Sequence, residues 1–293
     1  MNNLTINASF EGHPPHLSDK PTNPYMHGHI PIAQKAEYLQ YIEPKLGAVS
    51  QRELAKILGI GKTTINRWAL ELGYHPTKYT VNENFFDKWN EKSAYILGLI
   101  FSDGNIAWNP KKSYWTLTIT ACAKDKDHLE KVRKILCITK PLTYSEKTNS
   151  YRLTIANKSI CQKLMKLGIT PKKSLTVKFP QIPKEYLKDF IRGVIDGDGN
   201  VRYVDRKRSP YFEITIASGS KKFCKGLIAS VEENFGIAAK IRKAHGNTYV
   251  IQYACARGEK LAENIYNDAN LYLNRKFLAF KTSKERGRKK HGK

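Results

Sequence analysis

The sequence contains one helical segment twice, and this repetition constrains the fold more than any other feature. The copies are YILGLIFSDGN, residues 95–105, and DFIRGVIDGDGN, residues 189–200. Aligned on Asp103 and Asp198, they share a glycine five residues upstream, a mostly apolar run, and a glycine directly after the acid. The apolar runs do not suit a solvated surface, so we expect both helices in the core. The glycines after the acids are expected in the left-handed conformation that ends many helices, at Gly104 and Gly199.

Small residues recur along each helix at spacings of three and four, which places them on one face: Ala94 and Gly98, Gly193 and Gly197. Two such helices can approach backbone to backbone, which brings Asp103 and Asp198 together at one end. A helix C-terminus and a second carboxylate both disfavour an acid there. A divalent cation reverses both effects, because Mg²⁺ prefers carboxylate, water and phosphate oxygens. We therefore predict that Asp103 and Asp198 bind Mg²⁺, or another divalent cation such as Mn²⁺, for phosphate chemistry.

The repeated motif resembles that of the LAGLIDADG homing endonucleases and their maturase relatives. The second copy, IRGVIDGDG, matches well; the first, ILGLIFSDG, has Phe101 and Ser102 where the family has an acid and a small residue. The resemblance implies an α+β fold of tandem, pseudo-symmetric αββαββα repeats, with antiparallel saddle sheets on duplex DNA. It also implies magnesium-dependent hydrolysis of both strands at a long site, as in intron homing. Ser102 is not expected to bind the metal.

In the family, a basic residue from each repeat lies near the metal-bound water. The resemblance therefore implies catalytic roles for Lys173, in GITPKKS, and Lys276, in YLNRKF, with Lys172 and Arg275 as their competitors. A lysine beside a phosphate stabilises developing charge or transfers a proton, although simple phosphate contact explains these residues equally well. Asp196, which aligns with Phe101, is interpreted as support for its helix end.

Alternating segments follow both motif helices in the same order. Strands are predicted at 105–108, 114–121, 142–146 and 151–156, and again at 200–204, 211–217, 238–244 and 248–256. Helices are predicted at 127–136, 159–167, 221–235 and 259–269. The solvent-facing side chains of such strands can follow a major groove. The candidates for base contact are Trp115, Thr116, Thr118, Arg152, Arg202, Arg206, Thr215, Arg242 and Gln252, although a solvated polar strand face explains each about as well.

A short helix at Lys35–Pro44 precedes a second informative segment, residues 50–73. Ser50 and Glu53 form a capping box for a helix with Leu54, Ile57 and Leu58 on its apolar face. Gly59 makes the turn, and a second helix over 62–72 turns Ile65, Trp68, Ala69 and Leu72 inward. This pattern resembles a helix-turn-helix, whose second helix lies in the major groove; a plain helical hairpin is the alternative. The residue types suited to DNA contact there are Lys62, Thr63, Thr64, Asn66 and Arg67.

Composition supports a nucleic-acid partner. Fifty Lys and Arg against 26 Asp and Glu give a net charge of +24, which favours a polyanion. No apolar run is long enough to span a bilayer, and the five cysteines are scattered without a C-x-x-C pair, so we expect reduced thiols and no zinc site. We expect action on the genome in the cytoplasm of a prokaryotic or phage-infected cell, with an organelle left open. Ends without splicing residues lead us to expect no intein.

The sequence thus predicts six segments: an arm (1–34), the helix-turn-helix module (35–75), a linker (76–92), the two repeats (93–180 and 181–282) and a basic tail (283–293). We expect a monomeric, metal-dependent endonuclease that acts on double-stranded DNA. One alternative of the same fold binds without cutting, either as a maturase on intron RNA or as a transcription regulator. Another alternative is a regulator in which residues 50–73 supply the function and the repeats are scaffold.

Overall fold

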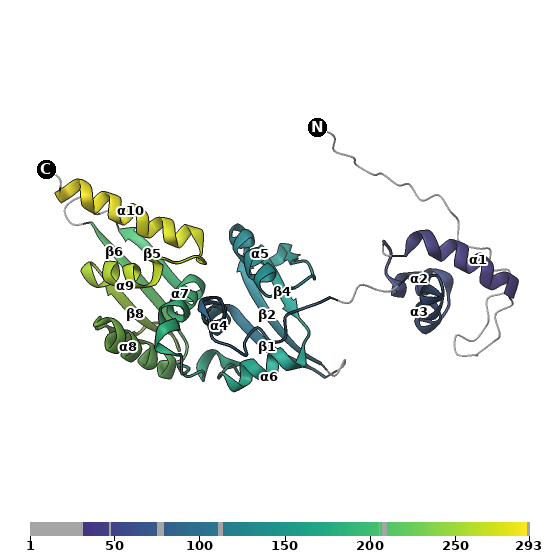
Figure 1. Ribbon diagram of the computed structural model, residues 1–293, viewed down its shortest axis with the longest axis horizontal. Coiled ribbons are helices and arrows are strands. Elements are labelled where there is room, and N and C mark those ends of the chain that lie inside the picture. Colours follow the sequence, from purple (N-terminus) through teal and green to yellow (C-terminus); the bar gives the residue numbers. More distant parts are fainter. Residues whose placement is uncertain are drawn as a thin grey trace. The chain divides into compact units, whose positions relative to one another are not determined.

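The computed structural model describes residues 32–46, 48–74, 79–110, 114–204, 206 and 210–291. The chain divides into two compact units, Met1–Lys78 and Tyr79–Lys293 (Figure 1). Most of the predicted arm, residues 1–34, lies outside the described residues, as do positions 292–293 of the predicted tail. Within the described residues, no helix is both long enough and apolar enough to cross a membrane.

The described part of the first unit consists of three α-helices around a small apolar core. They are α1 (Ile32–Ile42), continued by η1 (Glu43–Lys45), α2 (Gln51–Leu58) and α3 (Lys62–Glu71). The Ser50 hydroxyl accepts the Glu53 amide at 3.2 Å, and Gly59 ends α2 with φ of 65°. Gly59 matches the sequence prediction, whereas the capping box is half formed: within the described residues no bond runs from the Glu53 side chain back to the Ser50 amide. Ile57 differs from the prediction: it is 43% exposed, because Leu54 and Leu58 already fill the inner face of this two-turn helix.

The second unit contains two copies of one arrangement. In the first, α4 (Glu91–Asp103) is followed by β1 (Gly104–Asn109), β2 (Tyr114–Cys122), η2 (Ala123–Asp125), α5 (Lys126–Ile135), β3 (Thr143–Ser145), η3 (Glu146–Thr148), β4 (Ser150–Ile155), α6 (Lys158–Lys166) and η4 (Lys173–Leu175). In the second, η5 (Lys184–Tyr186) and α7 (Leu187–Asp198) are followed by β5 (Gly199–Val204), β6 (Tyr211–Ser218), α8 (Lys221–Phe235), β7 (Lys240–Lys243), β8 (Tyr249–Ala254), α9 (Ala256–Tyr266) and α10 (Asn274–His291). The predicted strands and helices of both repeats are present.

Each repeat forms one antiparallel four-stranded sheet, with strand orders β1-β2-β4-β3 and β5-β6-β8-β7. The period-two pattern decides which face is buried. In β2, Leu117 and Ile119 are buried, whereas Thr116, Thr118 and Thr120 lie on the other face, as predicted. We call that other, polar face of each sheet the saddle face.

The motif helices α4 and α7 pack side by side between the two sheets (Figure 1). Their backbones approach so closely that a Cβ on Gly98 would lie 2.2 Å from the Phe190 carbonyl oxygen, and one on Gly193 would lie 2.1 Å from that of Tyr95. The predicted backbone-to-backbone pair is therefore confirmed. The apolar runs of both helices lie in one shared core with the inner faces of both sheets.

Two segments differ from prediction because they pack on the repeats. Residues 79–90 are not a free linker: Phe85, Phe86 and Trp89 pack against the core, and the Asn82 amide donates to the Leu136 carbonyl at 3.0 Å. The predicted tail, 283–293, is not a separate arm, because α10 continues through it to His291. Apolar side chains of the first half of α10, such as Phe280, anchor this helix on the core.

Candidate active site

The site lies where α4 and α7 both end and the chain passes directly into a strand. Gly104 and Gly199 follow the last acids with extended backbones, φ of −83° and −80°, so the predicted left-handed conformation is wrong. Glycine is needed there for space: a Cβ at either position would lie 2.5 Å from the carbonyl oxygen four residues earlier, in the last helical turn. This abrupt helix-to-strand transition places Asp103 and Asp198 at the helix ends, beside the first strand of each saddle.

The two carboxylates lie within electrostatic reach of each other. Burial raises the pKa of Asp103 from 3.8 to about 7, and the charge of Asp198 contributes to this rise. Burial also raises the pKa of Asp198, partly opposed by Lys173 and Lys276. Asp103 is half-buried and Asp198 exposed, so both are open to a ligand from solvent. Gly197 permits this arrangement, because a Cβ there would lie 2.7 Å from the Asp103 Oδ2 atom.

Among the described residues, no group donates a hydrogen bond or forms an ion pair with the Asp103 or Asp198 side chain. Two carboxylates held close together without hydrogen-bond donors repel each other when both are ionised, and a bound cation would remove this repulsion. Within that same part of the chain there is no cluster of three or more His, Cys, Asp or Glu residues suited to a metal. The candidate site is therefore a pair of carboxylates, which would leave coordination positions to water and to a substrate phosphate.

The two predicted lysines lie at the same helix ends but contact backbone rather than carboxylate. Lys173 donates to the carbonyls of Phe101 and Ser102 at 2.5 and 3.3 Å. Lys276 donates to the carbonyls of Ile195, Asp196 and Gly197 at 2.7, 2.6 and 3.2 Å. Both ammonium groups thus offset the negative end of a motif helix and satisfy its last carbonyls.

Both lysines are buried, at 7% and 2% exposure, and burial lowers the pKa of each. The pKa of Lys276 falls to about 8, against the opposing effect of the nearby acids. The prediction placed Lys276 in a closing loop. In the structure it lies in the first turn of α10. The two competitors lie elsewhere: Lys172 is exposed, and Arg275 pairs with Asp125 of the first repeat at 3.0 Å.

Asp196 is a structural acid. It is buried, and its Oδ2 accepts the Tyr95 hydroxyl at 2.8 Å and the Leu273 amide at 2.7 Å, while its Oδ1 accepts the Tyr266 hydroxyl at 2.7 Å. Burial raises its pKa, and the three donors oppose that shift. These bonds tie α7 to α4, to α9 and to the residue just before α10. The interpretation of Asp196 as support for its helix end agrees with these contacts.

The corresponding second contact between the two helices carries aromatic rings in place of this polar network. The Tyr95 hydroxyl also lies 3.0 Å from His128 Nε2, so the Asp196 network reaches α5. Positions 95 residues apart exchange these types: Phe190 matches Tyr95, Phe101 matches Asp196, and Phe223 matches His128. Phe101 packs on Phe190 and Phe223 with ring centroids 5.3 and 6.0 Å apart. Sequence analysis missed this exchange, although the 95-residue offset contained the signal.

The predicted base-contact residues mostly lie on the saddle faces. Cross-strand register places Arg202 opposite Glu213, and Thr215 opposite Gln252, all on the saddle side. Trp115 is an exception, because it shares the parity of the buried Leu117 and packs against the core. The other candidates on the saddle side of their strands are Thr116, Thr118, Arg152 and Arg242, while Arg206 follows β5 and stacks over the Tyr211 ring.

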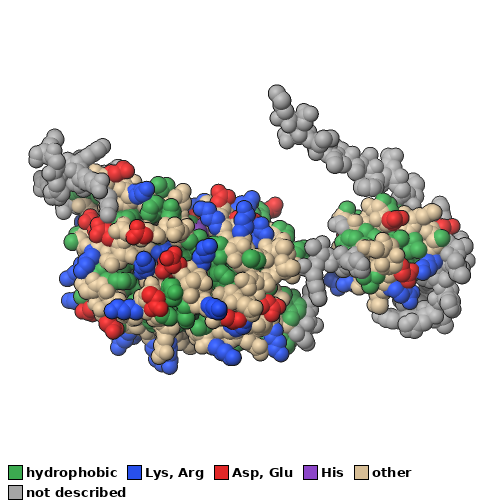
Figure 2. All heavy atoms as spheres, viewed as in Figure 1, with side chains coloured by type: hydrophobic (Ala, Val, Ile, Leu, Met, Phe, Trp, Pro, Cys, Tyr) green, Lys and Arg blue, Asp and Glu red, His purple; other side chains and the backbone are tan. Residues whose placement is uncertain are grey.

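Sequence analysis also missed Glu213, an acid buried on the saddle face of the second sheet. It accepts the Arg202 guanidinium and, at 2.6 Å, the Gln252 amide, while being only 1% exposed. Glu213 therefore fixes two side chains that reach solvent from neighbouring strands. Lys and Arg side chains are scattered over the visible face of this unit among smaller groups of acids (Figure 2).

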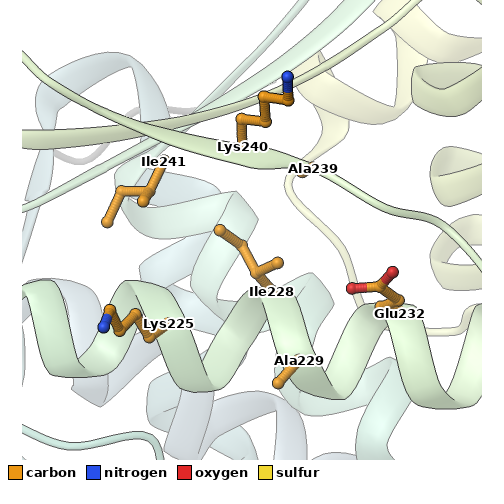
Figure 3. A pocket seen from close by; sticks show the side chains of 7 residues that line it. All are labelled: Lys225, Ile228, Ala229, Glu232, Ala239, Lys240 and Ile241. Carbon is orange, nitrogen blue, oxygen red and sulfur yellow. The ribbon is translucent and has the colours of Figure 1, made fainter.

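A separate groove between α8 and β7 contains none of the site residues. Its cavity of about 440 Å³ is lined by Lys225, Ile228, Ala229, Glu232, Ala239, Lys240 and Ile241 (Figure 3). Ile228 and Ile241 face each other across it, with the charged groups at its rim. It shares no residue with the helix ends that carry the acids.

Comparison with known families decides the nature of the second repeat, because residues 185–273 match the LAGLIDADG-like domain model. The second repeat belongs to the LAGLIDADG family. Its motif is the segment that ends in Asp198, and the LAGLIDADG resemblance predicted from the two motifs is thereby confirmed.

Solved structures agree on the fold. The LAGLIDADG meganuclease I-AabMI bound to uncleaved DNA is 11% identical, with a TM-score of 0.51 over 69% of this chain and 92% of that one. At this identity the likeness concerns the fold alone, and it confirms the α+β architecture with two antiparallel four-stranded sheets. I-DmoI in complex with DNA and calcium is also similar, at 17% identity and a TM-score of 0.44, over 62% of this chain and 92% of that one.

Among curated proteins, a probable translation initiation factor IF-2 of Thermococcus kodakarensis is 26% identical over 176 residues. The match covers 56% of this chain and 13% of that protein. The chain thus spans a small part of the length of this relative, and the relative's activity is not transferred to it.

Proposed function

We propose that the protein is a site-specific endonuclease that hydrolyses both strands of duplex DNA with a divalent cation, Mg²⁺ or Mn²⁺. The observation that carries this proposal is the convergence of Asp103 and Asp198. One carboxylate from each repeat arrives at the same end of a glycine-mediated helix pair, and neither has a donor among the described residues. Because one chain supplies both acids, we propose that the monomer is the active form.

The residues present fit a cation with oxygen ligands. Asp103 and Asp198 would hold it, and its positive charge would restore both carboxylates to their ionised form. When bound, such an ion activates water and offsets the charge that develops on the phosphate. Lys173 and Lys276 lie beside the acids and cap the helix ends. They would add positive potential where a scissile phosphate approaches, as expected of a preorganised site.

The two saddle faces would bind the duplex on either side of the acids. Arg202 and Gln252, held by Glu213, present donors of the type that read base edges in a major groove. The net charge of +24 would favour encounter with DNA at low ionic strength. Under this proposal, both repeats bind and each supplies one carboxylate for cutting.

The test is to incubate the full chain with Mg²⁺ and a library of long duplexes, and then to sequence the ends. Asp103→Asn and Asp198→Asn are each expected to lower cleavage at least about a hundredfold while leaving binding intact. Asp127→Asn, which removes an exposed carboxylate from α5, is the matched control and should cut normally. Unimpaired cutting by either site variant would refute the metal assignment.

One observation favours a second candidate, a relative that binds without cutting. The first motif has Phe101, packed among aromatic rings, where the second has the carboxylate of Asp196. Such a protein would act as a maturase on intron RNA or as a DNA-binding regulator. Tight RNA binding together with no magnesium-dependent cutting of any duplex would favour the maturase and overturn the nuclease proposal.

A further inference from the structure

The first unit has its own core, which fixes one face of α3 and leaves the other open. Each of the three helices contributes buried residues, and the Tyr38 ring of α1 stacks on Trp68 of α3 with centroids 5.7 Å apart. Ile65 and Trp68 are 0% and 1% exposed. The orientation of α3 within this unit is therefore set by packing, and its outer face is presented rigidly.

The outer face of α3 carries a row of side chains suited to the edges of bases. Residues spaced by one, four, five and eight positions lie on one helical face, and here they are Lys62, Thr63, Asn66, Arg67 and Leu70. Lys62, Thr63 and Arg67 are exposed, and Leu70 is 51% exposed. Asn66 is half-buried, and its buried Oδ1 atom has no hydrogen-bond partner within the described residues, so its amide would have to turn outward to meet a base.

The charge of this face points to a polyanion. Glu71 is the one acid in α3, and it is paired with Lys35 of α1 at 2.6 Å. The first turn of α3 contains no acid, so the positive end of its dipole is not offset by a carboxylate of its own. On the preceding helix, Arg52 and Lys56 are exposed and one turn apart, as is suitable for contact with phosphates.

We infer that the outer face of α3 enters the major groove of duplex DNA and reads a short sequence there. Arginine pairs with guanine, asparagine pairs with adenine, and an exposed apolar side chain can contact the thymine methyl group. A second copy of the chain would require a larger apolar patch, whereas Leu70 is the single large apolar side chain among the five residues of this face.

This contact of α3 with DNA would be separate from the contact of the saddle faces. The inference rests on the proposed function only in that both name duplex DNA as the partner. Both units belong to one chain, so binding by one raises the effective concentration of the other at a neighbouring sequence. The expected binding site then has two blocks, a long one for the saddles and a short one of about 3 to 5 base pairs for α3.

The experiment uses the full chain with Asp198→Asn, so that bound DNA is not cut, and selects binders from long random duplexes. Arg67→Ala in this background should erase preference in the short block and weaken binding about tenfold to duplexes that carry both blocks. Binding to duplexes with only the long block should not change. Lys56→Ala is the control: it should weaken binding evenly across sequences and reduce the salt dependence by about one charge.

Selection of the same two blocks at the same affinity by Arg67→Ala and by Asn66→Ala would overturn the inference. So would a dimer of the wild-type chain that Leu70→Ala converts to monomer, because the face would then be an interface between copies. If the wild type cuts no duplex but still selects the short block, the proposed function fails and this inference stands. If the wild type cuts duplexes that carry the long block and selects no short block, this inference fails and the proposed function stands.

Discussion

Replacement of Asp103 by asparagine should change how the stability of the cation-free protein depends on pH. Because burial and Asp198 raise the pKa of Asp103 to about 7, the folded chain keeps a proton that the unfolded chain releases near pH 4. The folded state therefore binds more protons across this window. The wild type should lose stability as pH rises from about 4 to about 7, and the stability would be fully present only below that range.

The size of the effect follows from the same pKa. Between pH 5 and the folded pKa of about 7 there are about two units, which correspond to at most about 2.7 kcal/mol. Asp103 is half-buried and therefore partly screened by solvent, so we expect about 1.5 kcal/mol. Asparagine carries no charge at any pH. Asp103→Asn should therefore gain about this much stability relative to the wild type between pH 5 and pH 8.

The measurement is urea denaturation at pH 5 and pH 8 with a chelator present, and unfolding is monitored by tryptophan fluorescence. Trp89, Trp108 and Trp115 all lie in the unit that contains the site, so the signal reports mainly on that unit. Adding Mg²⁺ at pH 8 should stabilise the wild type and not the variant. Asp127→Asn should follow the wild type. Parallel pH profiles for the wild type and Asp103→Asn would show that the pKa of Asp103 is not raised in the folded protein.

Three further predictions concern residues around the site. Gly193→Ala places a Cβ 2.1 Å from the Tyr95 carbonyl oxygen, so it should lower the free energy of unfolding by about 3 kcal/mol or more. Urea denaturation measures this loss, and a smaller one would mean that the two helices can move apart at little cost. Asp196→Asn should lower the free energy of unfolding by about 3 kcal/mol but leave the Mg²⁺ affinity, measured by calorimetry, unchanged. A loss of affinity would instead make Asp196 a metal ligand. Glu213→Gln should relax base preference where its two partners contact DNA, in a cleavage-site selection, while unchanged preference would limit Glu213 to a structural role.

Much of the fold could be predicted because its helix pairing and strand burial depend on residues that are a few positions apart in the sequence. Helix pairing depends on small residues at fixed spacing, and strands depend on period-two alternation, so both are visible along the chain. The conformation of Gly104 was predicted wrongly because a glycine after a helix serves two purposes. It can allow a left-handed turn, or it can make room for a chain that leaves the helix as a strand, and only the position of the next element separates them.

The surroundings of the site were harder to predict than its acids. The role of Lys276 depends on three backbone carbonyls that face it, and carbonyl positions leave no trace in the sequence. Glu213 was missed because strand alternation marks it as exposed, whereas cross-strand partners cover it. Arg192 lies buried within the second motif against Asp189 at 2.5 Å, and its charge is likewise satisfied by partners that are distant in sequence, such as the Leu271 carbonyl.

The exchange of residue types between these two equivalent helix contacts affects which halves can assemble. Two copies of the first repeat would set each buried Tyr95 hydroxyl against the ring of Phe101, without the carboxylate that accepts it in the mixed pair. Two copies of the second would bury each Asp196 against Phe190, so that each Asp196 would keep the Tyr266 hydroxyl but lose the one that Tyr95 donates. Each like-with-like pairing thus carries a penalty that the mixed pairing avoids. The divergence of the two halves therefore favours their mixed pairing over the pairing of either half with a copy of itself.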